Sequence, residues 1–126
     1  MTARVLLVDD EKDFLDIMAE RMEARGMDVT TTTSAEDALK MIQTESYDAV
    51  IMDFLMPEMD GFKALKLLKE AQPDLAIILQ TGNVREEERI EAKQLGAMDV
   101  FEKPADLNLL TQKIEDAKAL KTASPK

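Results

Sequence analysis

Short apolar runs alternate along the chain with longer stretches in which apolar residues recur every three or four positions. The runs are typical of buried strands, and the longer periodicity is typical of helices that bury one face. The expected strands are Arg4–Val8, Val29–Thr32, Asp48–Met52, Leu75–Gln80 and Met98–Glu102. The expected helices are Phe14–Ala24, a helix that starts at Ser34, Phe62–Glu70, Arg85–Leu95 and Leu107–Leu120. Strict alternation predicts an α/β fold with a parallel sheet covered by helices on both faces.

Polar residues and glycines mark several of the expected element ends. Ser34 is a good helix N-cap, and Asp37 stands three residues later, where a capping box would place an acid. Gly26 and Gly96 each follow a helical pattern and are expected to stop it. Val29–Thr32 has no long apolar stretch, so we expect this strand at a less buried position of the sheet.

The composition narrows the class of protein. A chain of 126 residues with 45% hydrophobic residues is enough for one domain with a real core. A net charge of −10 argues against direct binding to nucleic acid or to an anionic membrane. Cysteine and histidine are absent, which excludes disulfides, thiolate metal sites and Ser-His-Asp catalysis. No apolar run is long enough to span a membrane, and the start lacks a signal-peptide core, so we expect a cytoplasmic protein.

Three acidic residues stand at the downstream ends of two apolar runs. Asp9 and Asp10 follow Val5–Val8, and Asp53 follows Ala49–Met52. Open α/β sheets build their sites at the carboxyl ends of their strands. Two carboxylates about 4 Å apart repel each other by about 4 kcal/mol at an effective dielectric constant near 20, so a hard cation or a lysine is expected among them.

Two further polar positions are expected at the same edge of the sheet. Thr81 follows the fourth strand and Lys103 follows the fifth, and both could donate to phosphate oxygens. Gly82 after Thr81 leaves room for an incoming phosphoryl group. Taken singly, each motif has an ordinary alternative: acids at a helix start, a loop lysine, or a turn, as also at Asp60-Gly61.

Together and in order, these residues resemble the receiver domain of two-component response regulators. The resemblance is carried by Val8-Asp9-Asp10, the stretch Asp53–Gly61, Thr81-Gly82 and Lys103-Pro104. It covers essentially the whole chain, and several ordered motifs make it more specific than a lone acidic pair. It implies a doubly wound (βα)5 fold with a five-stranded parallel sheet in the flavodoxin-like order 2-1-3-4-5. The expected domain is 1–121, with 122–126 as a polar tail or the start of a linker.

The resemblance implies a phosphorylation-activated signalling switch rather than a conventional enzyme. Asp53 would accept a phosphoryl group from a phosphohistidine on a sensor histidine kinase or a histidine phosphotransfer protein. The domain would catalyse this transfer and its own autodephosphorylation. The absence of histidine agrees with this function, because the donor must then be another protein or a small phosphodonor.

The resemblance also assigns a metal site and a counter-ion. Asp10 and Asp53, with Asp9 acting directly or through water, would hold Mg²⁺ (or Mn²⁺). The backbone carbonyl of Leu55 would complete the protein ligands. Lys103 would pair with Asp53 and later with the phosphate. Hard oxygen ligands and an ammonium group suit phosphoryl transfer, which needs positioning and charge neutralisation more than a base.

The expected switch departs from the family's usual pattern in one place. Thr81 would swing in to hydrogen-bond a phosphate oxygen, and Gly82 would leave space for it. The family usually carries Tyr or Phe three residues before its lysine, but this position is Val100. Phe101 is adjacent, and since neighbouring strand residues point to opposite faces, it cannot replace the missing aromatic ring without a bulge.

Three other positions would tune the site by the same resemblance. Leu55, two residues after the acceptor, could hinder an attacking water, whereas Asn83, two residues after the threonine, could orient it. The net effect on the lifetime of the phosphorylated form is open. Lys103-Pro104 resembles the family's cis peptide, which would give a slow refolding phase.

The expected output is a change in the surface formed by the fourth helix, the fifth strand and the fifth helix. The chain would be a free-standing receiver or the N-terminal receiver of a larger regulator, with an unknown output partner and possible phosphorylation-dependent homodimerisation. A haloacid dehalogenase-type hydrolase uses similar residues but needs a second Asp where Leu55 stands. A flavodoxin would need hydroxyls and glycines where Asp9-Asp10-Glu11 stand. A docking module that is never phosphorylated remains an alternative.

Overall fold

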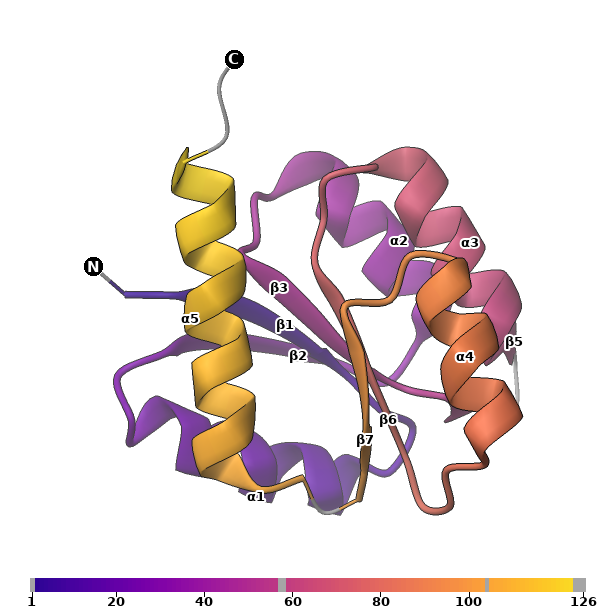
Figure 1. The fold of residues 1–126 in the computed structure, drawn as a ribbon. Coiled ribbons are helices and arrows are strands. Elements are labelled where there is room, and N and C mark those ends of the chain that lie inside the picture. The colour runs from indigo at the N-terminus through magenta and orange to yellow at the C-terminus, as the bar shows by residue number, and fades with distance from the viewer. Residues whose placement is uncertain (1, 57–58, 104, 124–126) are drawn as a thin grey trace.

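A computed structural model describes residues 2–56, 59–103 and 105–123, and side chains through residue 120 (Figure 1). The elements in chain order are β1 (Arg4–Val8), α1 (Lys12–Glu23), β2 (Asp28–Thr32), α2 (Ala35–Thr44), β3 (Ala49–Asp53), β4 (Leu55–Met56), β5 (Met59–Asp60), α3 (Gly61–Ala71), β6 (Ile77–Thr81), α4 (Glu86–Gln94), β7 (Asp99–Glu102) and α5 (Leu107–Ala123). The main sheet has 5 strands in the order β2-β1-β3-β6-β7, and every neighbouring pair is parallel. Because β6 and β7 are its fourth and fifth strands along the chain, the predicted order 2-1-3-4-5 is confirmed.

Helices cover both faces of this sheet (Figure 1). An apolar cluster of buried side chains lies between the sheet and the helices on each face. On one face, buried residues of α2, α3 and α4, such as Ile42, Leu65 and Ala92, pack against alternate strand residues. On the other face, residues of α1 and α5, such as Met22 and Ile114, pack against the remaining strand residues. Alternation of strand side chains between the two faces explains why the central strands are apolar throughout.

The edge strand β2 differs from the buried central strands as the sequence predicts. It pairs only with β1 in the sheet, and its residues are half-buried or exposed. β3 lies between β1 and β6 and is buried along its full length. The absence of a long apolar run in Val29–Thr32 is therefore explained by a strand that covers less of the core.

Capping residues define several helix ends. The Ser34 hydroxyl accepts a hydrogen bond from the Asp37 amide at 3.2 Å, which confirms this N-cap. Gly26 and Gly96 have positive φ angles of 89° and 110°, as expected for glycines that end helices. α1 begins at Lys12, two residues before the predicted start, so that Glu11 is its N-cap residue.

The segment after β3 differs from the prediction. Leu55–Met56 and Met59–Asp60 pair as a small antiparallel sheet, which the apolar pattern does not indicate. The Asp60-Gly61 pair is not simply a turn, because the Asp60 carboxylate caps α3 by accepting hydrogen bonds from the backbone amides of two following residues. A Cβ atom at position 61 would overlap the carbonyl oxygen and ring of Phe54, so only glycine fits there.

Strand and helix ends shift by a few residues elsewhere. Asp53 ends β3 as predicted, one residue beyond the apolar run, whereas Thr81 is the last residue of β6 and the sequence places it just after the strand. α5 continues to Ala123, three residues beyond its predicted end at Leu120. The predicted cis peptide before Pro104 lies outside the described residues. Within the described ranges, no helix combines the length and apolar character needed to cross a membrane.

Candidate functional site

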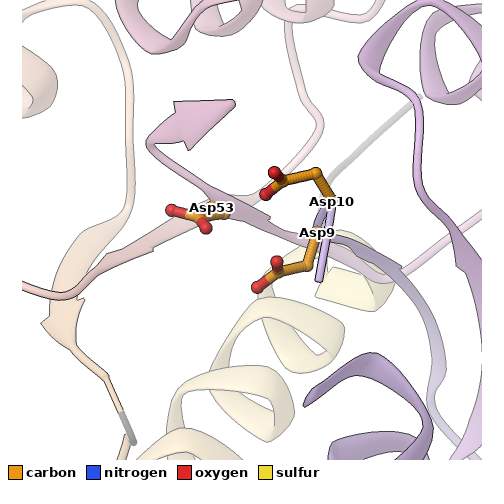
Figure 2. Close-up of side chains that lie close together, drawn as sticks. All are labelled: Asp9, Asp10 and Asp53. Carbon is orange, nitrogen blue, oxygen red and sulfur yellow. The ribbon is translucent and has the colours of Figure 1, made fainter. Parts of the chain in front are cut away.

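Three carboxylates converge at the carboxyl edge of the sheet (Figure 2). Asp9 and Asp10 follow β1, and Asp53 ends the neighbouring β3. One oxygen from each carboxylate lies within 4.8 Å of the others, a spacing that could hold a metal ion. Asp9 and Asp53 are buried, with 0% and 5% exposure, whereas Asp10 is exposed. The predicted cluster therefore forms, with two acids in the protein and one facing the solvent.

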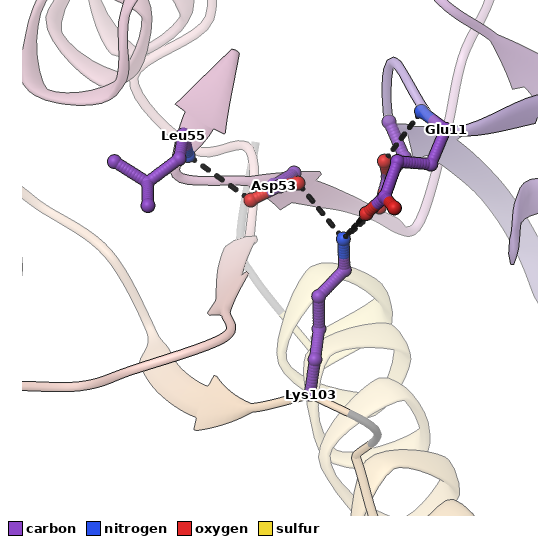
Figure 3. A network of polar contacts seen from close by, with 5 residues as sticks. Glu11, Asp53, Leu55 and Lys103 are labelled. Atoms are coloured by element: carbon purple, nitrogen blue, oxygen red, sulfur yellow. Dashed lines mark hydrogen bonds and ion pairs between the residues drawn. The ribbon is translucent and has the colours of Figure 1, made fainter.

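Lys103 joins this cluster from the end of β7 (Figure 3). Its Nζ lies 2.8 Å from Asp53 Oδ2, 2.7 Å from Asp9 Oδ2 and 2.9 Å from Glu11 Oε1. Its ammonium group also lies 4.4 Å from the centre of the Phe14 ring. Burial acts to lower the pKa of Lys103, but the hydrogen bonds to the three carboxylates outweigh it, so its pKa lies well above the usual value.

Among the three clustered carboxylates, Asp9 has the environment least favourable to a negative charge. Burial raises the pKa of Asp9 and outweighs the opposing contacts with Lys103 and with the Glu11 amide. That amide donates to Asp9 Oδ1 at 2.9 Å. Asp9 Oδ2 lies close to the Lys103 ammonium but has no well-aligned hydrogen bond among the described residues. Lys103 therefore compensates the buried Asp9 charge only in part, and a divalent cation near this carboxylate would stabilise its charged form further.

Asp53 is held in a defined orientation by two donors. The backbone amide of Leu55 donates to Asp53 Oδ1 at 3.0 Å, and Lys103 donates to Oδ2 (Figure 3). Leu55 follows β3 after one residue and is 64% exposed. The carboxylate is thus fixed next to an ammonium group and other acids, as a carboxylate nucleophile or metal ligand would need to be.

Thr81 lies at the same edge with its hydroxyl unused. Its side chain is buried, and Oγ1 has no hydrogen-bond partner among the described residues. The Lys103 amide donates to the Thr81 carbonyl at 2.7 Å, which joins the ends of β6 and β7. A Cβ atom at Gly82 would meet nothing within 4 Å, and Asn83 is exposed. The space that the sequence predicts after Thr81 is therefore open.

Val100 and Phe101 point to opposite faces of the sheet, as expected. Val100 is buried in the cluster with α2, α3 and α4, whereas Phe101 is half-buried against the cluster with α1 and α5. In the strand register, Val100 pairs with Leu79 and Phe101 with Gln80, without a bulge. Phe101 therefore does not occupy the place of the missing aromatic residue.

Two contacts of Lys103 come from residues that the sequence analysis did not assign to the site. Glu11 and Phe14 lie at the start of α1, about 90 positions away from Lys103 in the chain. The one available signal is the residue type at the N-cap, because Glu is uncommon where Ser, Thr, Asp or Asn usually cap a helix. Gln80 is a further unexpected residue: it is fully buried, and neither end of its amide has a partner among the described residues.

This arrangement can perform two kinds of chemistry. Three clustered carboxylates are suitable ligands for a divalent cation, and one of them is oriented as an oxygen nucleophile. The ammonium of Lys103 can compensate negative charge on a transferred group at the Asp53 oxygen that it already contacts.

Comparisons with known proteins agree on one family. The family model described as response regulator receiver domain matches residues 5–115. The response regulator SaeR of Staphylococcus epidermidis is 41% identical over 100 residues, which cover 79% of this chain and 43% of that protein. SaeR of Staphylococcus aureus is 37% identical over the same shares. The chain thus spans less than half the length of these curated relatives.

Solved structures give the same result. A response regulator receiver domain protein from Clostridium thermocellum is similar with a TM-score of 0.88 and 30% identity, over 95% of this chain and 97% of that chain. The NtrC4 receiver domain, solved as a beryllofluoride-activated dimer, is similar with a TM-score of 0.85 and 28% identity, over 92% of this chain and 96% of that chain.

Proposed function

Because this chain belongs to the response regulator receiver domain family of two-component systems, we propose that it is a signalling switch activated by phosphorylation of Asp53. Receiver domains are signalling switches rather than conventional enzymes. The assignment of Asp53 as phosphoacceptor depends on the environment of its carboxylate. This carboxylate is buried, oriented by the Leu55 amide and paired with Lys103 at 2.8 Å. Asp10 is exposed and has neither of these two contacts.

The proposed reaction is a transfer from a phosphohistidine of a partner kinase or phosphotransfer protein. A carboxylate oxygen of Asp53 forms a bond to phosphorus, the phosphorus–nitrogen bond breaks, and its electron pair stays on the histidine nitrogen. Since phosphoryl transfer needs positioning and charge neutralisation, Asp53 needs no general base. Lys103 then pairs with the phosphoryl oxygens, and hydrolysis by water returns the carboxylate and phosphate.

The residues present fit Mg²⁺ or Mn²⁺. Asp10 and Asp53 offer carboxylate oxygens, Asp9 lies within reach directly or through water, and the Leu55 carbonyl would complete the protein ligands. The buried Asp9 carboxylate supports this site, since its burial disfavours the charged form and a divalent cation would favour it. When bound, the cation neutralises charge on the transferred phosphoryl group.

The proposed switch starts at Thr81. Its hydroxyl has no hydrogen-bond partner in the part of the chain that the structure describes, so it can turn toward a phosphate oxygen. Its carbonyl accepts a hydrogen bond from the amide of Lys103, the residue that follows β7. Gly82 leaves the space open. With Val100 in place of an aromatic residue, the change would reach the α4–β7–α5 surface without rotation of a ring. Exposed Leu55 and Asn83 would set water access to the phosphoryl group.

The proposed partners are a sensor histidine kinase or a histidine phosphotransfer protein, and an output protein or domain that reads the α4–β7–α5 surface. The NtrC4 receiver domain was solved as an activated dimer, and a phosphorylation-dependent homodimer is proposed here by analogy. A net charge of −10 supports partners other than nucleic acid or anionic membranes. We expect the domain to act in the cytoplasm.

Intact mass measurement after incubation with acetyl phosphate and Mg²⁺ tests this function directly. We expect a mass increase of one phosphoryl group, lost in Asp53→Asn and in the presence of EDTA. Asp74→Asn is the matched control, because it makes the same chemical change at an exposed position before β6, at the opposite edge of the sheet. An adduct that persists in Asp53→Asn would contradict the assigned acceptor.

A cognate kinase provides the second part of the test. If neither acetyl phosphate nor phosphorylated kinase modifies the wild-type chain, the docking module that is never phosphorylated becomes the better explanation. Turnover of a phosphate ester without a lasting adduct would instead favour a hydrolase of the haloacid dehalogenase type. Such a hydrolase needs a second Asp two residues after the nucleophile, where this chain has Leu55.

A further inference from the structure

Glu11 occupies a helix N-cap but does not cap the helix. Its backbone has the extended conformation of an N-cap residue, yet its side chain accepts no hydrogen bond from the first turn of α1. The carboxylate instead lies 2.9 Å from Lys103 Nζ. Ser, Thr, Asp or Asn would cap α1 better. The side chain at this position therefore contacts Lys103 instead of capping the helix.

Carboxylates surround the Lys103 ammonium on the sides that a phosphate oxygen would use, with hydrogen bonds to Glu11 and Asp53 and an ion pair with Asp9. An ammonium group has three N–H donors. Three carboxylates, those of Asp9, Glu11 and Asp53, lie within 2.9 Å of Nζ. For Lys103 to bind a phosphoryl oxygen, one of these carboxylates must give up its place.

Glu11 is the carboxylate that can leave at the lowest cost. Its side chain is 65% exposed, so water can hydrate it once it turns away from Lys103. Asp9 and Asp53 are buried, have 0% and 6% side-chain exposure, and belong to the group of acids that could hold a metal ion. Glu11 does not belong to that group.

We propose that Glu11 is a positioning residue that holds the Lys103 ammonium in the unphosphorylated state and competes with the incoming phosphoryl group for it. This inference rests on the proposed phosphorylation of Asp53. Glu11 slows phosphorylation, because its contact with Lys103 must break before the ammonium can reach the transferred group. The Phe14 ring, 4.4 Å from the ammonium, keeps Lys103 in place when Glu11 leaves.

Two variants of Glu11 separate positioning from charge. Glu11→Gln removes the charge, whereas Glu11→Asp keeps the charge, shortens the side chain and restores a good helix cap. Glu20→Gln is the matched control, since Glu20 is exposed on the same helix and its side chain has no ion pair among the described residues. We expect acetyl phosphate with saturating Mg²⁺ to phosphorylate both Glu11 variants about three- to fivefold faster than wild type and Glu20→Gln.

A second measurement needs neither metal nor phosphodonor. The ¹⁵N NMR signal of the Lys103 ammonium, assigned by its loss in Lys103→Arg, reports proton exchange with water. We expect slow exchange in wild type and Glu20→Gln, and at least fivefold faster exchange in both Glu11 variants, because one of its three carboxylate partners is gone. If Glu11 acted only on the start of α1, this exchange would be the same in wild type and in both variants, because the partners of Lys103 would not change.

Specific outcomes would overturn the inference. Equal phosphorylation rates in wild type and Glu11→Gln would exclude competition for Lys103. A fast Glu11→Gln with a wild-type rate in Glu11→Asp would assign the effect to net charge alone. Unchanged ammonium exchange in both variants would show that Glu11 does not hold Lys103. If the wild-type chain accepts no phosphoryl group, the proposed function itself fails, and the NMR measurement still decides whether Glu11 holds Lys103.

Discussion

Two ionic clusters at the main sheet have central ions of opposite charge. Around Lys103, one cation is surrounded by the carboxylates of Asp9, Glu11 and Asp53 at 2.7, 2.9 and 2.8 Å. Around Asp99, one carboxylate is surrounded by the cations of three residues, with nitrogen–oxygen distances of 3.3 to 3.6 Å. These are Arg89, Lys93 and Lys113. Each cluster contains four charges, but their geometry, burial and charge balance differ.

The difference separates the proposed phosphorylation site from a structural cluster. One positive against three negative charges leaves the Lys103 cluster with a formal charge of −2, and it adjoins the exposed Asp10. Such a site gains stability when a divalent cation binds. The Asp99 cluster has a formal charge of +2 and long, partly exposed pairs that join α4 and α5 to β7. It can hold the α4–β7–α5 surface together without a ligand.

Removing the central ion of the Lys103 cluster should give the largest effect. Lys103→Met leaves two buried carboxylates without a counter-ion, and we expect a loss of about 3 kcal/mol in the free energy of unfolding at pH 7. Urea unfolding measures the loss. Lys93→Met in the Asp99 cluster is the control: its side chain is 50% exposed, so we expect a loss below about 0.5 kcal/mol. Equal losses would contradict the distinction between the clusters.

Stabilisation by Mg²⁺ should be the second largest effect, and it should depend on the Lys103 cluster but not on the Asp99 cluster. We expect Mg²⁺ at ten times its Kd to stabilise the fold by about 1.4 kcal/mol, measured as a rise in Tm or in the urea midpoint. Asp10→Asn should abolish most of this gain, because it removes one of the three clustered carboxylates. Asp99→Asn should retain all of it. A Tm that stays constant up to millimolar Mg²⁺ would argue against a metal site.

The charge of Asp99 should contribute less to the free energy of unfolding than Lys103 or bound Mg²⁺, and only in a defined pH range. Burial acts to raise the pKa of Asp99, but the Val100 amide, Lys113 and Lys93 outweigh it and lower the pKa below its usual value of 3.8. A lowered folded pKa adds stability above the unfolded pKa, and this stability is lost as pH falls through the folded pKa. We expect Asp99→Asn to be about 1 kcal/mol less stable than wild type at pH 6.

Acid titration of this difference gives its check. Urea unfolding of wild type and Asp99→Asn should converge as the pH is lowered from about 4 toward the folded pKa. Asn keeps an oxygen that can accept from the Val100 amide, so the comparison isolates the charge. A difference that stays constant down to pH 2 would assign the loss to packing rather than to ionisation.

The smallest expected difference between the two clusters is in how salt changes their contribution to stability. In 1 M salt, with a Debye length of about 3 Å, the partly exposed pairs of Asp99 are screened more than the buried pairs of Lys103. We expect the stability difference between wild type and Asp99→Asn to fall by more than half between 0.1 and 1 M NaCl. The difference for Lys103→Met should change by less than a quarter. The same urea series measures both.

The position of the candidate site was largely predictable, because its residues stand at strand ends. Asp9, Asp53, Thr81 and Lys103 each end or directly follow a strand, and parallel strands end at one edge. The order of the strands was also predictable, but only from the resemblance to a known family. Exact element ends were not, because the same residues can end a strand or start a loop, as Asp53 and Thr81 do.

Other parts of the site could not be predicted from local patterns. Asp9 and Asp10 are adjacent and chemically identical, yet one is fully buried and the other exposed. The contact between Lys103 and Glu11 joins residues 92 positions apart. The short β4–β5 pair and the capping role of Asp60 depend on how the chain turns after β3.

The hydrophobic pattern of the chain is sufficient to predict the alternating architecture, the core on both faces of the sheet and the edge at which acids, a hydroxyl and an ammonium group gather. These features follow from periodicity, because burying apolar faces leaves few arrangements for such a chain. The packing of distant segments sets which acids contact Lys103 and why Asp99 rather than Asp10 is surrounded by cations. It also places Val100 and Phe101 in the clusters on opposite faces of the sheet. Such contacts depend on strand register, helix placement and side-chain rotamers, which arise only when distant segments pack together.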